Sequence, residues 1–190
     1  MQIPNEEFVE FTKISRLSRN CCITEKLDGT NGLVYITESG DVFAGSRSRW
    51  ITPEQDNYGF ARWVEGNKEE LLKLGPGKHF GEWWGQGIQR KYDQKQKWFS
   101  LFNTGKWSKR IDLKEGQQNP PECCSIVPVI YEGIFTTSDI KIALDQLQQG
   151  GSVAAPGFMK PEGVVVYHTA ANCYFKKTIE KDEVPKGMQK

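Results

Sequence analysis

The run Lys26-Leu27-Asp28-Gly29 constrains this chain more than any other segment. It follows the apolar-leaning stretch Cys22–Thr24, so the lysine is expected at the end of a strand. An Asp-Gly pair suits a tight turn, because glycine tolerates positive φ and an aspartate side chain can bond back to the backbone. The pattern therefore predicts strands over residues 22–27 and 33–37, joined by a turn at Asp28–Gly32.

A lysine in this position can act as a nucleophile toward phosphorus. A free lysine amine has a pKa of about 10.4, so it is protonated and inert at neutral pH. Partial burial or neighbouring cations favour the neutral, reactive amine. The alternative is a surface hairpin with an ordinary lysine, and this segment alone does not decide between the two.

The rest of the pattern predicts one α+β domain of 190 residues, with mostly antiparallel β-sheets flanked by helices. Further strands are expected at 42–44, 79–84 and 126–131, helices within 57–73 and at 138–149, and a terminal hairpin at 163–167 and 173–179. Ser138 is a candidate cap for the second helix. The polar and basic residues 85–97 are expected to form a loop or mobile segment.

Charge and cysteine content restrict the cellular setting. The net charge of +1 gives no global signal for nucleic acid, and no run of 18 apolar residues predicts a membrane span. The first residues lack the basic and apolar regions of a signal peptide. Five cysteines, four of them in vicinal pairs, argue against a disulfide framework and against a zinc site. We therefore expect a cytoplasmic protein with reduced cysteines, and a monomer.

Two polar residues at strand positions are candidate ligand contacts. Arg47 follows a predicted strand, and its planar guanidinium suits phosphate, although exposed arginines at strand ends are common. Glu82 shares a strand face with Phe80 and Trp84. A carboxylate among aromatic rings usually has a partner or a function, such as accepting a hydrogen bond from a ribose hydroxyl. The alternative for Glu82 is an edge strand with one solvated face.

The C-terminal strands carry three more candidates. Glu162 lies just before a β-branched strand, where a carboxylate can hold a divalent cation. Lys176 and Lys177 are neighbours on the next strand, so only one of them can enter a common site. The alternative for either lysine is a solvated surface charge.

Residues 86–114 form a basic segment, with eight basic and two acidic residues, so that 8 − 2 gives a charge of about +6. Three aromatic residues, Tyr92, Trp98 and Trp107, are interleaved with the basic ones. Cations that contact phosphates, together with rings on which bases stack, are the features that strand binding requires. The segment predicts a nucleic-acid partner, with a solvated basic loop as the alternative.

Taken in order, these clusters resemble the covalent nucleotidyltransferase superfamily of polynucleotide ligases and mRNA capping enzymes. The strongest similarity is to the RNA ligase 2 family, which includes RNA-editing ligases and many phage ligases. The matching segments are Lys26-Leu27-Asp28-Gly29 (nucleotidyl motif I), Ser46-Arg47 (motif Ia), Phe80-Gly81-Glu82 (motif III), Glu162-Gly163 (motif IV) and Phe175-Lys176 (motif V). This resemblance implies a nucleotidyltransferase (ATP-grasp-like) catalytic domain.

The resemblance also implies an activity: an ATP-dependent RNA ligase that joins 5′-phosphate and 3′-hydroxyl ends of nicked or single-stranded RNA through a lysyl-AMP intermediate. It implies Lys26 as nucleophile, Glu162 as the ligand of Mg²⁺ or Mn²⁺, and Lys176 with Arg47 as phosphate contacts. The implied contacts of the nucleotide are Glu82 on the ribose, Phe80 shaping the pocket, and Glu25, Asp28, Asn31, Tyr131 and Lys177 around it. A DNA ligase, a capping-type nucleotidyltransferase and a non-catalytic nucleic-acid-binding module on the same fold remain alternatives.

The chain departs from the family pattern in two ways. Motif V is usually Lys-x-Lys, but here the two lysines are adjacent and Tyr174 occupies the first lysine position. Few residues follow motif V, so we expect residues 1–190 to form a single adenylation domain without an OB or helical domain. A bacterial or phage-infected cell is the expected setting.

Overall fold

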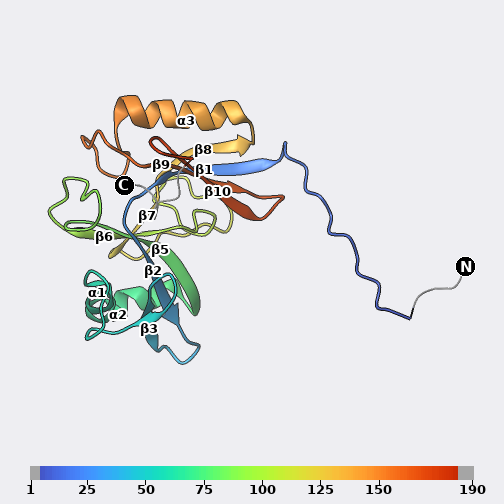
Figure 1. The fold of residues 1–190 in the computed structure, drawn as a ribbon. Coiled ribbons are helices and arrows are strands. Elements are labelled where there is room, and N and C mark those ends of the chain that lie inside the picture. Colours follow the sequence, from blue (N-terminus) through green and yellow to red (C-terminus); the bar gives the residue numbers. More distant parts are fainter. Residues whose placement is uncertain (1–4, 184–190) are drawn as a thin grey trace, which may run out of the picture.

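The computed structural model describes residues 5–183, which form two β-sheets and three α-helices (Figure 1). The strands are β1 (Asn20–Lys26), β2 (Thr30–Ile36), β3 (Val42–Gly45), β4 (Trp50–Ile51), β5 (Gly77–Gly85), β6 (Lys97–Leu101), β7 (Cys124–Ile126), β8 (Val129–Ile134), β9 (Gly163–His168) and β10 (Cys173–Thr178). The helices are α1 (Phe60–Gly66), α2 (Lys68–Leu71) and α3 (Thr137–Gly150), with a 3₁₀ turn at Leu72–Leu74.

The smaller sheet has the strand order β10-β9-β1-β8, and all its neighbours are antiparallel. Helix α3 covers one face of it (Figure 1), because Ala143 and Leu147 pack against Ile23, Val164 and Val166. Strand residues alternate between faces, so the positions between these apolar residues point away from α3. Lys26 is one of them.

The larger sheet has the order β4-β3-β2-β5-β6-β7, and only the β6–β7 pair among these strands is parallel. Its core face packs against α1, where Val34, Phe60, Trp83 and Phe99 belong to one buried cluster. The predicted α+β class with mostly antiparallel sheets is confirmed.

The chain passes from one sheet to the other at residues 27–29, immediately after Lys26. Both strands predicted around this segment are present, but the alternative of a surface hairpin is excluded, because β1 and β2 lie in different sheets and do not pair. Gly29 does not have positive φ either. It is required for close packing, since a Cβ at this position would lie 2.3 Å from the carbonyl oxygen of Trp83 and 2.8 Å from Cβ of Trp84.

Several predicted boundaries shift. The helix expected within 57–73 is broken at Asn67 into α1 and α2. The strand expected at 126–131 is divided between β7 and β8, with Pro128 outside both. The cap of helix α3 is Thr136, two residues before the predicted Ser138, and its hydroxyl accepts a hydrogen bond from the backbone of Asp139. Strand β6 was not predicted, and residues 97–101 lie within the expected basic segment.

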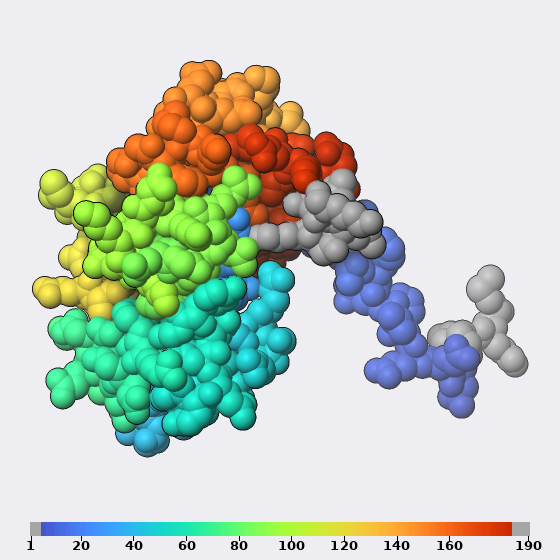
Figure 2. Space-filling view, turned by 60° about the vertical axis from the view of Figure 1, so that its left-hand side comes forward, coloured from blue at the N-terminus to red at the C-terminus, as the bar shows by residue number. Residues whose placement is uncertain are grey.

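Residues 85–96 form a packed loop between strands β5 and β6, in agreement with the loop that the sequence predicted. Figure 2 shows these residues in green, between α1 and α2 below and the orange C-terminal part above. Ile88 and Tyr92 are completely buried. Gln89, Lys91, Tyr92 and Asp93 have φ between 44° and 61°, a conformation that side chains other than glycine adopt at a cost. The burial of Ile88 and Tyr92 stabilises this conformation.

No helix of residues 5–183 is both long and apolar enough to span a membrane.

We expect Gly29→Ala to lower the free energy of unfolding by about 2 kcal/mol or more, because the new Cβ meets backbone that cannot move away. Urea unfolding followed by circular dichroism measures this effect. Gly66→Ala is the matched control, since Gly66 ends α1 with no atom within 4 Å of the position of its Cβ. Equal stability of the two variants would contradict the close approach at Gly29.

Candidate active site

Lys26 and Glu162 form an ion pair where β1 and β9 lie side by side. Their Nζ and Oε2 atoms are 2.5 Å apart. Lys26 is paired in register with Gly163, so the lysine and the glutamate before Gly163 come from adjacent backbone positions. The Glu162 side chain is buried and that of Lys26 is about one-fifth exposed. The site therefore has a buried carboxylate with a reachable amine.

The larger sheet contributes Glu82, Asn31 and Arg47. Glu82 on β5 lies opposite Asn31 on β2. Its carboxylate accepts hydrogen bonds from the backbone of Gly29 at 3.0 Å and from Nδ2 of Asn31 at 3.2 Å. Arg47 donates to Oδ1 of Asn31 at 3.0 Å. Three residues predicted from separate motifs are thus connected in one hydrogen-bonded chain.

Burial raises the pKa of Glu82 to about 7. The positive charge of Lys26 and the hydrogen bond from Gly29 act in the opposite direction, whereas the charges of Glu162 and Asp28 raise the pKa further. These electrostatic contributions place Glu82 in the same site as the Lys26–Glu162 pair. Both sheets therefore contribute charged groups to one region next to the chain crossing.

Lys176 on β10 points to the same side of the smaller sheet as Lys26. Lys176 is paired with Val165, which in turn is paired with Thr24, two residues before Lys26. Residues two apart on a strand share a face. The structure therefore brings Lys176 to the face that carries the ion pair.

Lys177 lies on the opposite face, toward α3, because it is paired with the buried Val164. Its ammonium forms an ion pair with Asp182 at 2.8 Å. The prediction that Lys177 contacts the nucleotide is wrong. The alternation of strand side chains excludes it once Lys176 faces the site.

Two residues that the sequence analysis did not assign to the site hold the crossing segment in place. The hydroxyl of Tyr92 accepts a hydrogen bond from the backbone of Asp28 at 2.8 Å. Arg90 donates to the Asp28 carboxylate at 3.1 Å and to the carbonyl of Lys160 at 3.0 Å. Arg90 therefore connects motif I to the segment before Glu162. Both were included only in the basic segment, and no local pattern in the sequence shows which side chains of a loop turn inward.

The comparisons with known proteins agree with this geometry. The family model described as RNA ligase matches residues 19–181. The chain belongs to the RNA ligase family. A search of curated proteins found no match.

Solved structures of the Naegleria gruberi RNA ligase share the fold. A variant with AMP and manganese superposes with a TM-score of 0.60 at 20% identity, over 85% of this chain and 50% of that one. A second variant, with ATP and manganese, gives a TM-score of 0.60 at 21% identity, over 86% of this chain and 51% of that one. This chain therefore spans about half the length of these ligases.

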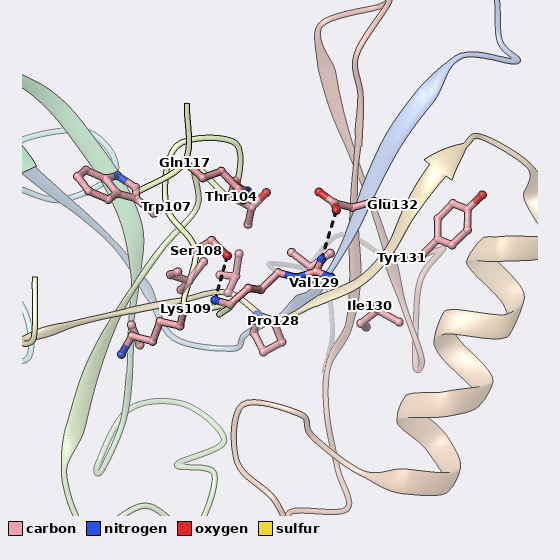
Figure 3. A pocket seen from close by; sticks show the side chains of 14 residues that line it. Thr104, Trp107, Ser108, Lys109, Gln117, Pro128, Val129, Ile130, Tyr131 and Glu132 are labelled. Atoms are coloured by element: carbon pink, nitrogen blue, oxygen red, sulfur yellow. Dashed lines mark hydrogen bonds and ion pairs between the residues drawn. The ribbon is translucent and has the colours of Figure 1, made fainter. Parts of the chain in front are cut away.

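Like Lys177, Tyr131 and Glu25 lie on the α3 face of the smaller sheet, although both were expected at the nucleotide. Tyr131 is paired with Ile23 on the α3 side, and its hydroxyl donates to the carbonyl of Ile134 at 2.9 Å. Figure 3 shows its ring beside the helix, directed away from Glu132. The Tyr131 ring faces α3, so the structure does not bring it to the Lys26 face, where the nucleotide was expected. Val129 is the residue of β8 that lies opposite Thr24, on the Lys26 face.

The carboxylate of Glu25 forms its hydrogen bonds with the loop after α3 and not on the Lys26 face. It accepts hydrogen bonds from the hydroxyl of Ser152 at 2.6 Å and from the backbones of Val153 and Ala154 at 2.8 and 2.9 Å. Burial raises the pKa of Glu25, and these hydrogen bonds act in the opposite direction. Glu25 holds the loop after α3 against the sheet, so the structure gives it a structural role that the sequence analysis did not predict.

Two of the three rings named in the basic segment are not accessible for stacking on bases. Tyr92 and Trp107 are buried, so the predicted interleaving of rings and cations is wrong at both positions. Lys109 and Arg110 do line a cavity of about 720 Å³ between residues 104–117 and β8 (Figure 3). Arg110 is within 4.0 Å of Glu132 at its rim.

We expect Glu82 to make the stability of this protein depend on pH. Because burial raises its pKa to about 7, the folded chain binds the proton more tightly than the unfolded chain. The resulting stabilisation is complete below pH 4.5 and is lost as the pH rises through 7. Glu82→Gln should therefore gain about 2–3 kcal/mol relative to the wild type between pH 5 and pH 8. Urea unfolding at both pH values measures the difference, and a constant difference would contradict the raised pKa.

Proposed function

We propose that this protein is an ATP-dependent RNA ligase that joins 5′-phosphate and 3′-hydroxyl ends through a lysyl-AMP intermediate. The observation that carries the proposal is the position of Lys26 at the crossing between the sheets, with Glu162, Glu82 and Lys176 directed to the same region. Membership of the RNA ligase family supports it, as does the AMP or ATP bound in the Naegleria structures. We also propose that residues 19–181, which contain all five motifs, form the adenylation domain.

In the first step, the Nζ of Lys26 attacks the α-phosphorus of ATP. A nitrogen–phosphorus bond forms, the bond to the pyrophosphate oxygen breaks, and the amine proton is lost. Only the neutral amine can attack, so the ion pair with Glu162 must open before the reaction. Negative charge increases on the phosphate oxygens, and the cations of Lys176 and Arg47 stabilise it.

The later steps transfer and then release the nucleotide. A 5′-phosphate oxygen of RNA attacks the lysyl-AMP phosphorus, so the bond to Lys26 breaks and the amine recovers its proton. A 3′-hydroxyl then attacks the activated 5′-phosphorus, and AMP leaves. Glu82 and Asn31, fixed by their mutual hydrogen bond, are placed to contact the ribose hydroxyls throughout.

A divalent cation fits the donor set, although its protein ligands are few. Among residues 5–183, no group of three or more His, Cys, Asp or Glu side chains is arranged to hold a metal ion. Mg²⁺ bound with nucleotides usually takes one or two carboxylates, phosphate oxygens and water. The buried carboxylate of Glu162 would hold it, and the cation would neutralise phosphate charge while competing with Lys26 for that carboxylate.

We expect labelling with α-³²P-ATP and Mg²⁺ or Mn²⁺ to give a covalent adduct on a denaturing gel. Lys26→Ala and Lys26→Arg should both lose it completely, because neither provides the amine. The arginine variant keeps a cation beside Glu162, so its stability controls for misfolding. Prior treatment with pyrophosphate removes AMP already bound. An adduct that persists in both variants would contradict the assigned nucleophile, and none in the wild type would favour a non-catalytic binding module.

The neighbouring lysines of β10 provide a matched pair. Lys176→Ala should reduce the rate of adduct formation by about 10²-fold, because it removes a cation on the Lys26 face. Lys177→Ala should leave the rate within about threefold of the wild type, because Lys177 faces α3 and pairs with Asp182. Single-turnover kinetics with labelled ATP measures both rates. The reverse order of effects would show that the register of β10 is misassigned.

A further inference from the structure

One half of the larger sheet presents uncovered aromatic rings to solvent on the face opposite α1. Phe43, Trp50 and Phe80 are 49%, 56% and 51% exposed. The ring of Tyr35 lies 6.2 Å from that of Phe43 and 5.8 Å from that of Trp50. We call these four residues together with Leu33 the aromatic face. Exposed clusters of this kind mark interaction sites more often than isolated apolar residues do.

The register of the strands connects the aromatic face directly to the candidate active site. Glu82 and Asn31 are opposite one another, and the next pair on the same face is Phe80 and Leu33. The pair beyond these is Lys78 and Tyr35. Each step of two residues covers about 7 Å along the strand. The aromatic face therefore begins one step away from the ribose contact and continues away from Lys26.

Strand β3 extends the same surface sideways. Phe43 lies opposite Tyr35, and Gly45 lies opposite Leu33 on one side and Trp50 on the other. Gly45 has no side chain, and the side chain of Leu33 packs over it. The aromatic face therefore extends across four neighbouring strands, β5, β2, β3 and β4.

Three exposed cations border the aromatic face, and the acidic residues Glu38 and Asp41 lie at its other end, in the turn between β2 and β3. Lys78 is exposed on the face itself, and Arg47 and Arg49 are exposed in the turn between β3 and β4. Among the residues that β2, β3, β4 and β5 place on this face, Glu82 is the only acidic one, and it belongs to the active site. Exposed rings bordered by cations match the chemistry of bases and phosphates.

We propose that the aromatic face binds unpaired bases of the RNA strand whose end is placed at Lys26. The inference rests on the proposed ligase function and specifies its substrate: a single-stranded segment beside the end to be joined. Bases in a duplex are stacked on one another, so only unpaired bases can place their faces on Phe80, Trp50 and Phe43. Lys78, Arg47 and Arg49 would contact the phosphates between them.

The test measures binding of a fluorescein-labelled, 5′-hydroxyl single-stranded RNA of 12 nucleotides by fluorescence anisotropy, without ATP. Trp50→Leu should weaken binding about tenfold, whereas Trp50→Phe should stay within about threefold of the wild type, because stacking requires an aromatic ring. Phe43→Leu should behave like Trp50→Leu. Phe11→Leu is the control, because Phe11 is exposed but lies before β1, outside both sheets and all five motifs.

A second RNA of the same length with abasic sites separates base contacts from phosphate contacts. The wild type should bind it about tenfold more weakly than the intact RNA, and Trp50→Leu should cause no further loss. An equal loss on both RNAs, or no loss on either, would overturn the proposal. So would a wild type that dimerises in sedimentation while Trp50→Leu remains monomeric, because the face would then be a contact between protein chains.

Adduct formation with labelled ATP distinguishes this proposal from the proposed function. All four variants should form the lysyl adduct within about twofold of the wild-type rate, because none of the substituted residues belongs to the site around Lys26. If Trp50→Leu and Phe43→Leu form the adduct normally and bind RNA as tightly as the wild type, the proposal for the aromatic face is overturned and the proposed function is not. Loss of the adduct in the wild type would overturn the proposed function, whatever the anisotropy shows.

Discussion

The structure depends on the passage of the chain between the two sheets at residues 27–29. Gly29 lies so close to the backbone of Trp83 that no side chain fits, and its amide donates to Glu82. The Tyr92 hydroxyl accepts a hydrogen bond from the amide of the preceding residue, Asp28. These contacts fix where β1 ends, and therefore where Lys26 lies. A nucleophile on a rigid strand end needs little reorganisation before reaction.

The same crossing concentrates buried carboxylates around one amine. Glu162 pairs with Lys26, and Glu82 is close enough for both charges to act on its pKa. Burying carboxylates near one another is unfavourable unless cations or donors compensate them. Arg90, the Gly29 amide and Asn31 supply that compensation within the chain. A phosphate ligand with its cation would redistribute these charges, which is how we interpret the cluster as a nucleotide site.

The packed loop at 85–96 shows how strain and burial combine at this site. Four non-glycine residues adopt positive φ there, yet Ile88 and Tyr92 are completely buried. The strain positions Arg90 and Tyr92 against Asp28. Meanwhile the half of the larger sheet that this loop does not cover leaves Phe43, Trp50 and Phe80 exposed. The region next to Lys26 is therefore covered, and the region beside it is open to solvent.

The sequence alone determined the fold class and the motif order, and it predicted Lys26, Glu82 and Glu162 as site residues, because these follow from local patterns of residue type and spacing. Only the tertiary structure decided which face each strand residue occupies. Tyr131 and Lys177 were misplaced because a face is set by the register with neighbouring strands, and that pairing joins residues far apart in sequence. For the same reason, the inward turn of Tyr92 depends on a distant partner, Asp28, which no local pattern specifies.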